Sequence, residues 1–170
     1  MQNIFVKTKY SILIILFFLP VSIAFADYML PYPSYMPGNK LYTLSRFFDE
    51  VGRIWNFGMI AGTKYALHLS DKYLVEAKTL FEYQQYLLGL DALQRSDEEL
   101  KALGLRNTEQ LEHMFREAMV VHISLLSKLR ENLPEQFEWR PEKEEAQVLK
   151  IYEELSRSID VRKKTIPQKP

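Results

Sequence analysis

A long stretch without proline limits this chain to few folds. No proline occurs between Gly38 and Leu133, and apolar residues recur at intervals of three and four along that stretch. This spacing gathers apolar side chains on one face of a helix, whereas a half-buried strand alternates them with period two. No segment alternates in that way for long, so we expect no sheet. The pattern predicts an all-α domain.

The same spacing divides the stretch into helices. A first helix with one apolar face should end near residues 56–58, and a second should run from about Ile60 to about Leu90. Apolar pairs in the second helix repeat every seven residues, which is typical of helices packed in a bundle or coiled coil. The first face comprises Leu41, Leu44, Phe47, Phe48, Val51, Ile54 and Trp55, and the pairs are Ala66/Leu67, Tyr73/Leu74, Leu80/Phe81 and Leu87/Leu88.

Capping signals predict two further helices. Residues 96–99, Ser-Asp-Glu-Glu, form a capping box that should open a short helix ending at Gly104. Asn107 or Thr108 should cap the next helix, which ends at Leu133 just before Pro134. Its buried stripe comprises Leu111, Met114, Phe115, Ala118, His122, Leu125, Leu126, Leu129 and Leu133.

Residues 135–140 fit two interpretations, a docked loop or part of a helix kinked at Pro141. Pro141 suits the first position of a last helix, and three glutamates follow it in the first turns. The whole pattern predicts a largely antiparallel bundle of about four long helices plus one short helix, covering residues 41–163, with a frayed tail at 164–170. The last helix would carry Glu142, Glu144 and Glu145 at its start, Val148, Leu149, Tyr152, Leu155 and Ile159 on its apolar face, and Arg162, Lys163 and Lys164 at its end.

The first residues match a secretory signal peptide, residues 1–26. Lys7 and Lys9 precede an uncharged apolar run, Ser11 to Ile23. Small side chains at the −3 and −1 positions then favour signal cleavage. The predicted cleavage residues are Ala24 and Ala26, with Asp27 as the first residue after the cut.

An uncleaved membrane anchor is the alternative interpretation of this segment. Residues 10–26 carry no charge, and their length is near the lower limit of about 17 residues for a spanning helix. Pro20 favours cleavage, because proline kinks a helix. We therefore expect an exported, secreted or envelope-associated protein, or else one anchored at its N-terminus and facing outward.

An extended strap, residues 27–40, should follow the signal. Its prolines hold the chain out of a helical conformation. If the signal is removed, we expect three tyrosines to clamp the strap onto the bundle; if it is retained, they would lie at the membrane interface. These tyrosines are Tyr28, Tyr32 and Tyr35.

The opening of the strap resembles a known family. The run Leu30 to Pro37, Leu-Pro-Tyr-Pro-Ser-Tyr-Met-Pro, and the run Leu41 to Arg46 are similar to the start of an exported bacterial domain, domain of unknown function 5667. Leu69 to Ala77 and Val121 to Leu126 resemble its later motifs. The chain departs from that pattern at Ser34, Gly38 and Ser45. The resemblance implies an extracytoplasmic helical domain and no known activity, so it assigns no functional residue.

Charge gives nucleic-acid binding no electrostatic support, and the cysteine content rules out two kinds of covalent attachment. Basic and acidic side chains number 22 each, and the signal contains two of the lysines and no acid, so the remainder has a net charge of about −2. A protein this close to neutral has no field that would attract nucleic acid. The chain has no cysteine, which excludes both disulfides and lipid attached to a cysteine.

Two groups of residues are candidates for chemistry. Glu76 stands where the seven-residue repeat expects an apolar side chain, so burial would raise its pKa and suit it to act as an acid. Glu109, His113 and Glu117 share a helix face at four-residue spacing and could hold a metal. His122 lies about 180° around the helix from His113, so the two cannot share one ion, and we expect a core histidine there.

Neither candidate brings a recognised catalytic motif with it, and the sequence predicts no cofactor. The favoured function is a noncatalytic exported interaction or structural module of the cell envelope, with a protein or envelope partner or a second copy. Membrane contact is expected only if the signal is retained. Such a module should expose an apolar patch of several hundred Å². The alternatives are a helical enzyme acting on envelope polymers, with Glu76 as acid, and a small-ligand or metal-binding bundle.

Overall fold

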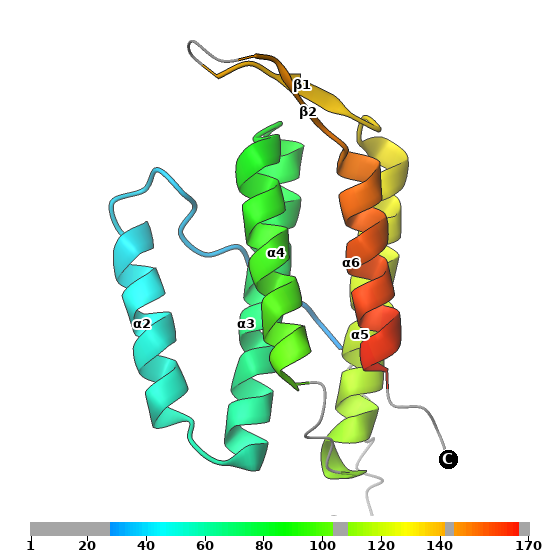
Figure 1. Cartoon of the computed structure of the whole chain (residues 1–170). Coiled ribbons are helices and arrows are strands. Elements are labelled where there is room, and N and C mark those ends of the chain that lie inside the picture. Colours follow the sequence, from blue (N-terminus) through cyan, green and yellow to red (C-terminus); the bar gives the residue numbers. More distant parts are fainter. Residues whose placement is uncertain (1–27, 104–108, 142–144, 167–170) are drawn as a thin grey trace, which may run out of the picture.

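The computed structural model of this chain describes residues 28–103, 109–141 and 145–166 (Figure 1). The signal segment and its predicted cleavage residues Ala24, Ala26 and Asp27 lie outside these ranges, as do Gly104, the cap at residues 107–108 and Glu142 and Glu144. None of the helices in the described ranges is long and apolar enough to cross a membrane.

The described residues form five helices and one hairpin, which confirms the all-α prediction. Successive helices run antiparallel, and the hairpin lies across one end of the bundle (Figure 1). The elements are α2 Tyr42–Trp55, α3 Met59–Glu82, α4 Tyr86–Leu103, α5 Glu109–Asn132, β1 Phe137–Trp139, β2 Gln147–Leu149 and α6 Ile151–Thr165.

The predicted second helix is in fact two helices. The heptad pattern predicted one helix to Leu90, but a turn at residues 83–85 separates α3 from α4. Gln84 has a positive φ of 59°, and the amide of Gln85 donates to the carbonyl of Leu80 at 2.9 Å. The pair that extended the repeat past the turn, Leu87/Leu88, lies on α4 and is exposed, although α3 and α4 contribute other side chains to the same core.

The predicted capping box does not start a helix. Residues 96–99 lie inside α4, and no break occurs there. The Ser96 hydroxyl is buried and donates to the carbonyl of Ser70 on α3 at 2.8 Å. It is therefore used between helices, and not to cap an end.

A short sheet is present where none was expected. β1 and β2 pair antiparallel, with Phe137 opposite Leu149 and Trp139 opposite Gln147. The last helix accordingly begins at Ile151 and not at Pro141. Strands of three residues are too short to show a period-two pattern. The rings of Phe137 and Tyr86 lie 4.8 Å apart between centroids, so the hairpin covers one end of the core.

The core of α3–α6 contains two apolar clusters. Along α3, α4 and α5, buried polar residues separate the part that enters one cluster from the part that enters the other, and α6 contributes Ser158 and Arg162 to the same polar layer. One cluster comprises Leu74, Ala77, Leu80, Phe81, Ala92, Leu93, Leu126, Leu129, Ile151, Leu155 and Ile159, and the other Leu67, Leu100, Leu103, Leu111, Phe115, Ala118 and Met119. The polar layer between them comprises Ser70, Asp71, Ser96, Asp97, His122, Ser158 and Arg162.

Candidate functional site

Helix α2 packs with its polar side toward the bundle and its apolar side toward solvent. Asp49 is the buried residue of α2, while the large apolar side chains of the helix are exposed. The sequence correctly predicted this helix and the residues that share its apolar face. An amphipathic helix at a protein surface usually buries that face, so the orientation of α2 is reversed. We call the contact between α2 and the bundle the polar seam; it comprises Tyr42, Ser45, Asp49, Arg53, Lys72, Tyr73, Glu76, Arg95 and Glu99.

The middle of the polar seam is built around Asp49. Nζ of Lys72 on α3 lies 2.6 Å from both carboxylate oxygens of Asp49 and also donates to Ser45 Oγ at 2.9 Å. The Tyr73 hydroxyl donates to Asp49 Oδ2 at 3.2 Å. Burial and the negative charge of Asp49 raise the pKa of Tyr73 above its ordinary value. The buried carboxylate is thus fully engaged in holding α2 to α3.

Glu76, the candidate acid, belongs to the start of the seam. Glu76 is only 1% exposed, and Tyr42 of α2 donates from its hydroxyl to Glu76 Oε1 at 2.8 Å. Nη1 of Arg95 lies 3.6 Å from the same oxygen and donates to the Tyr42 hydroxyl at 2.6 Å. Glu76 Oε2 has no hydrogen-bond partner among the described residues. Burial raises the pKa of Glu76, and its contacts with Tyr42 and Arg95 oppose that rise.

The end of the polar seam contains an ion pair between α2 and α4 and a close contact between α2 and α3. Arg53 Nη1 donates to Glu99 Oε2 on α4 at 2.9 Å, and Nη2 pairs with the other oxygen. Gly52 faces α3, where a Cβ would overlap the Tyr65 hydroxyl. That hydroxyl donates to the carbonyl of Asp49 at 3.1 Å. With a larger residue at position 52, the Tyr65 side chain would have to move and would lose this hydrogen bond.

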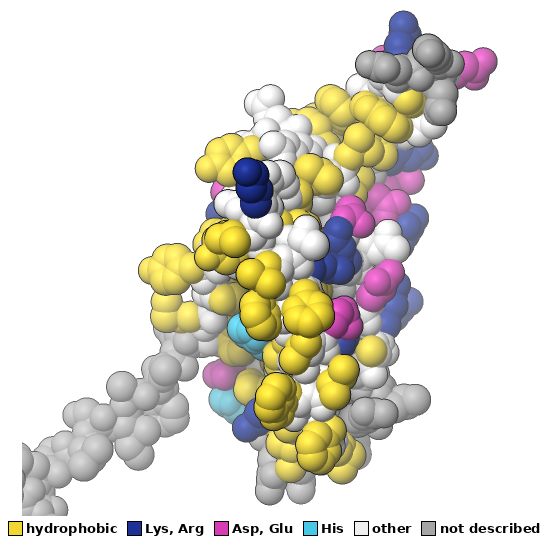
Figure 2. Space-filling model, turned by 90° about the vertical axis from the view of Figure 1, so that its left-hand side faces the viewer, with side chains coloured by type: hydrophobic (Ala, Val, Ile, Leu, Met, Phe, Trp, Pro, Cys, Tyr) yellow, Lys and Arg dark blue, Asp and Glu magenta, His cyan; other side chains and the backbone are white. Residues whose placement is uncertain are grey.

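The outward side of α2 and the turn after it form a continuous apolar strip, which we call the α2 apolar surface. Figure 2 shows hydrophobic side chains following one another down this face of the molecule, with the charged side chains mostly to one side. Exposed fractions range from 43% for Ile60 to 83% for Phe57. Single exposed apolar residues are common, but a contiguous strip marks a contact site. The surface comprises Leu41, Leu44, Phe47, Phe48, Ile54, Trp55, Phe57, Met59 and Ile60.

One of the three strap tyrosines clamps the strap. Tyr28 is half-buried, packs against the second apolar cluster, and donates from its hydroxyl to Asp71 on α3. Tyr32 is 93% exposed and Tyr35 is 48% exposed. The expected clamping role is therefore confirmed for Tyr28 and wrong for the other two.

His122 is a core histidine, as predicted, and it lies in a chain of buried polar groups. Its Nε2 lies 2.7 Å from Asp71 Oδ1, and its Nδ1 accepts a hydrogen bond from Nε of Arg162 at 3.3 Å. These partners fit a neutral ring with its proton on Nε2. Burial lowers the pKa of His122, Asp71 opposes that change, and Arg162 reinforces it. Arg162 also pairs with Asp97, so the layer is satisfied internally.

The predicted metal ligands do not form a site in the described part of the chain. The His113 side chain is 85% exposed, and its Nδ1 lies 3.4 Å from Glu117 Oε2. The Glu109 side chain lies outside the description. Among the described residues, no three histidine or carboxylate side chains are grouped closely enough to hold a metal ion.

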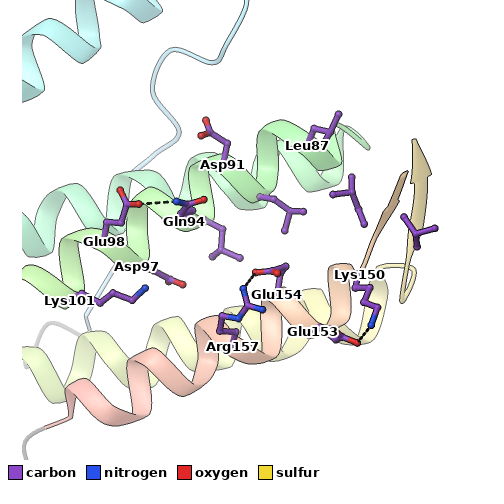
Figure 3. A pocket seen from close by; sticks show the side chains of 14 residues that line it. Leu87, Asp91, Gln94, Asp97, Glu98, Lys101, Lys150, Glu153, Glu154 and Arg157 are labelled. Carbon is purple, nitrogen blue, oxygen red and sulfur yellow. Dashed lines mark hydrogen bonds and ion pairs between the residues drawn. The ribbon is translucent and has the colours of Figure 1, made fainter. Parts of the chain in front are cut away.

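An open cleft of about 690 Å³ lies between α4 and α6. Several of its polar side chains bond to neighbours on their own helix: Gln94 with Glu98 at 2.9 Å, and Glu154 with Arg157 at 2.8 Å. Asp97 bonds instead to Ser158 and Arg162 on α6 and so belongs to the polar layer. In Figure 3 these groups spread along both helices and do not converge on one point. The cleft therefore defines no substrate.

The fold and the α2 apolar surface together define a small helical domain with one outward-facing apolar helix. No family model matches this chain, and neither does any curated protein or solved structure. The resemblance to domain of unknown function 5667 therefore stays a prediction.

The residues that orient α2 were not identified from the sequence. Asp49 and Arg53 were not singled out, and Glu99 was assigned to a capping box. One signal could have pointed to them: α2 carries charged and apolar groups on opposite sides, while Glu76 interrupts the apolar pattern of the helix it packs on.

Proposed function

We propose that this chain is an exported, noncatalytic interaction module of the cell envelope that binds through the α2 apolar surface. The observation that carries the proposal is the reversed orientation of α2. In the polar seam, the charged side of α2 contacts the bundle. The apolar side of α2 therefore remains accessible to a partner.

Energetics support this interpretation. Burial of one large apolar side chain is worth about 1.5–3 kcal/mol, so several such groups left in water represent a large unused driving force. Turning α2 over would bury them only by separating the Lys72–Asp49 and Arg53–Glu99 pairs. For the Lys72–Asp49 pair, which is largely buried, breaking the pair costs about 3–5 kcal/mol. The Arg53–Glu99 pair is partly exposed and contributes less. The seam thus maintains an outward apolar surface that a partner can cover.

The position of Glu76 gives the enzymatic alternative little support. A general acid must reach the substrate, whereas Glu76 is buried and is bonded to Tyr42 within the seam. The metal-binding alternative rests on Glu109, His113 and Glu117, of which His113 and Glu117 pair with each other at the surface.

Site-specific photo-crosslinking tests the proposal. A photoreactive amino acid at Phe48, on the α2 apolar surface, should give one dominant adduct when the full chain is produced in its native host. The matched position is Val120 on α5, which is equally exposed at 59% but lies outside the surface. Equal adduct yields from the two positions, or no adduct from Phe48, would contradict the proposed role.

A further inference from the structure

We propose that the α2 apolar surface docks into the interface of a lipid bilayer, with α2 lying in the membrane plane. This inference rests on the proposed function and names the chemistry of its partner. Three independent features of the chain favour lipid over a protein partner or a second copy.

The first feature is the composition of the surface. It contains Phe47, Phe48, Trp55 and Phe57, and aromatic rings are favoured at the boundary between headgroups and acyl chains. Helices that lie in this boundary carry Trp, Phe and Leu on one face and polar groups on the other, with low overall hydrophobicity. Helix α2 shows this pattern: its apolar side chains lie on one side of the helix and its polar side chains on the other.

The second feature is the shape of the surface. Ile54 and Trp55 are 78% and 79% exposed, so they protrude from the molecule, and Phe57 is 83% exposed at the edge of a small pocket. A partner that inserts a helix of its own would need a groove on this surface, which a protruding ridge does not offer. A protruding ridge of large apolar side chains fits a fluid apolar phase, which closes around it.

The third feature is the segment that precedes the described residues. The uncharged stretch from Tyr10 to Ala26 ends where the strap begins, and the strap leads directly into α2. As a signal or as an anchor, such a segment brings the domain to a membrane. The bilayer is therefore the apolar phase nearest to α2 when the domain folds.

Electrostatics make the inference specific. The basic residues of α2, Arg46 and Arg53, are turned toward the bundle, where Arg46 lies over the Tyr73 ring and Arg53 pairs with Glu99. Docking should thus depend on apolar burial and not on anionic lipid. Vesicles with and without phosphatidylglycerol are expected to bind α2 equally, and added salt should not release it.

The two tryptophans provide the measurement, because Trp55 lies on the surface and Trp139 lies on β1 in the hairpin. A full-length Trp139→Phe variant is added to phosphatidylethanolamine vesicles with brominated acyl chains, with and without phosphatidylglycerol. We expect Trp55 emission to shift to the blue and to be quenched about twofold or more relative to unbrominated vesicles. The full-length Trp55→Phe variant has the same N-terminal segment, and its Trp139 emission should not be quenched.

A second comparison uses the surface itself. The double variant Phe47→Ser/Phe48→Ser, made in the Trp139→Phe chain, should lose most of the Trp55 quenching. Val120→Ser, on α5, should retain it. The substituted phenylalanines are 61% and 59% exposed, so helix content measured by circular dichroism should not change.

Three other outcomes would overturn the inference, and each leads to a different conclusion about the partner. An unquenched Trp55 together with a protein adduct from Phe48 would make the partner a protein and leave the proposed function standing. A blue shift that grows with protein concentration in the absence of lipid would make the partner a second copy. An unquenched Trp55 without any adduct would remove both the inference and the proposed function.

Discussion

At the scale of single residues, the polar layer in the interior is a connected network of hydrogen bonds and ion pairs. The neutral ring of His122 donates to Asp71 and accepts from Arg162, while Arg162 pairs with Asp97. A second proton on His122 would fall on Nδ1, directly opposite the guanidinium of Arg162. The layer therefore tolerates one protonation state of His122 and disfavours the other.

This arrangement predicts a particular response to pH. Because the pKa of His122 is lowered in the folded state, the unfolded chain binds the extra proton more readily. The stability due to His122 is present above its ordinary pKa of 6.5 and is lost as the pH falls through the lowered value. His122→Gln retains a donor and an acceptor but cannot titrate. In urea titrations between about pH 7.5 and 5, the variant should lose less unfolding free energy than the wild type.

The exposed histidine provides the control for this experiment. His113→Gln should leave the pH dependence as it is in the wild type, because the His113 side chain is 85% exposed. Parallel pH profiles for wild type and His122→Gln would show that His122 binds protons equally in the folded and unfolded states.

At the scale of elements, periodicity identifies which residues share a face but not what that face meets. It predicted α2 and its apolar side correctly, and it left the orientation open, because orientation depends on partners such as Lys72 and Glu99 on other helices. It also merged α3 with α4, because an apolar pair on α4 extended the repeat past the turn. The β-hairpin was missed because strands of three residues give no periodic signal. Glu76 was correctly identified as unusual, but its hydrogen bond with Tyr42 is a tertiary contact.

Gly52 tests how closely α2 must approach the bundle. In an exposed helix, Gly→Ala is stabilising by up to about 1 kcal/mol. Here the new Cβ would overlap the Tyr65 hydroxyl, so we expect the opposite sign. Amide hydrogen exchange across α2 should become faster in Gly52→Ala, while exchange in the cores of α3 and α5 should change little.

Removing the obstacle should remove the effect. In the double variant Gly52→Ala/Tyr65→Ala, α2 should exchange no faster than in Tyr65→Ala alone, which is a measurable coupling between the two sites. Slower exchange of α2 in the single Gly52→Ala variant would mean that helix propensity outweighs the overlap.

At the scale of the whole molecule, the polar layer fixes how the four core helices align. Each of α3, α4, α5 and α6 contributes to it at the level where the two apolar clusters meet. Sliding one helix by a single turn, about 5.4 Å, would move its polar residues into an apolar cluster. Such a shift would bury charges such as Asp97 without partners, so one alignment is strongly preferred.

Arg162 is the residue on which this alignment most depends. Its side chain is fully buried and bonds to Asp97, Ser158, Ser96 and His122. Arg162→Leu leaves the Asp97 carboxylate buried without its counter-charge, which should lower the unfolding free energy by about 3–5 kcal/mol in urea titrations.

The next residue on α6 gives a matched control. Lys163→Leu removes the same charge from a side chain that is 60% exposed, and it should change stability by no more than about 0.5 kcal/mol. Equal losses in the two variants would mean that helix-end charge, and not the polar layer, explains the effect.

The strap contact of Tyr28 has a consequence for the order of events in time. Tyr28 follows the predicted cut after Ala26 by two positions, and its hydroxyl is bonded to Asp71 in the folded domain. A segment held against the bundle cannot at the same moment occupy the cleft of a protease. If the chain is processed at Ala26, processing must precede docking of the strap. A domain whose strap had already docked through Tyr28 would then not be cleaved, and it would retain its signal segment.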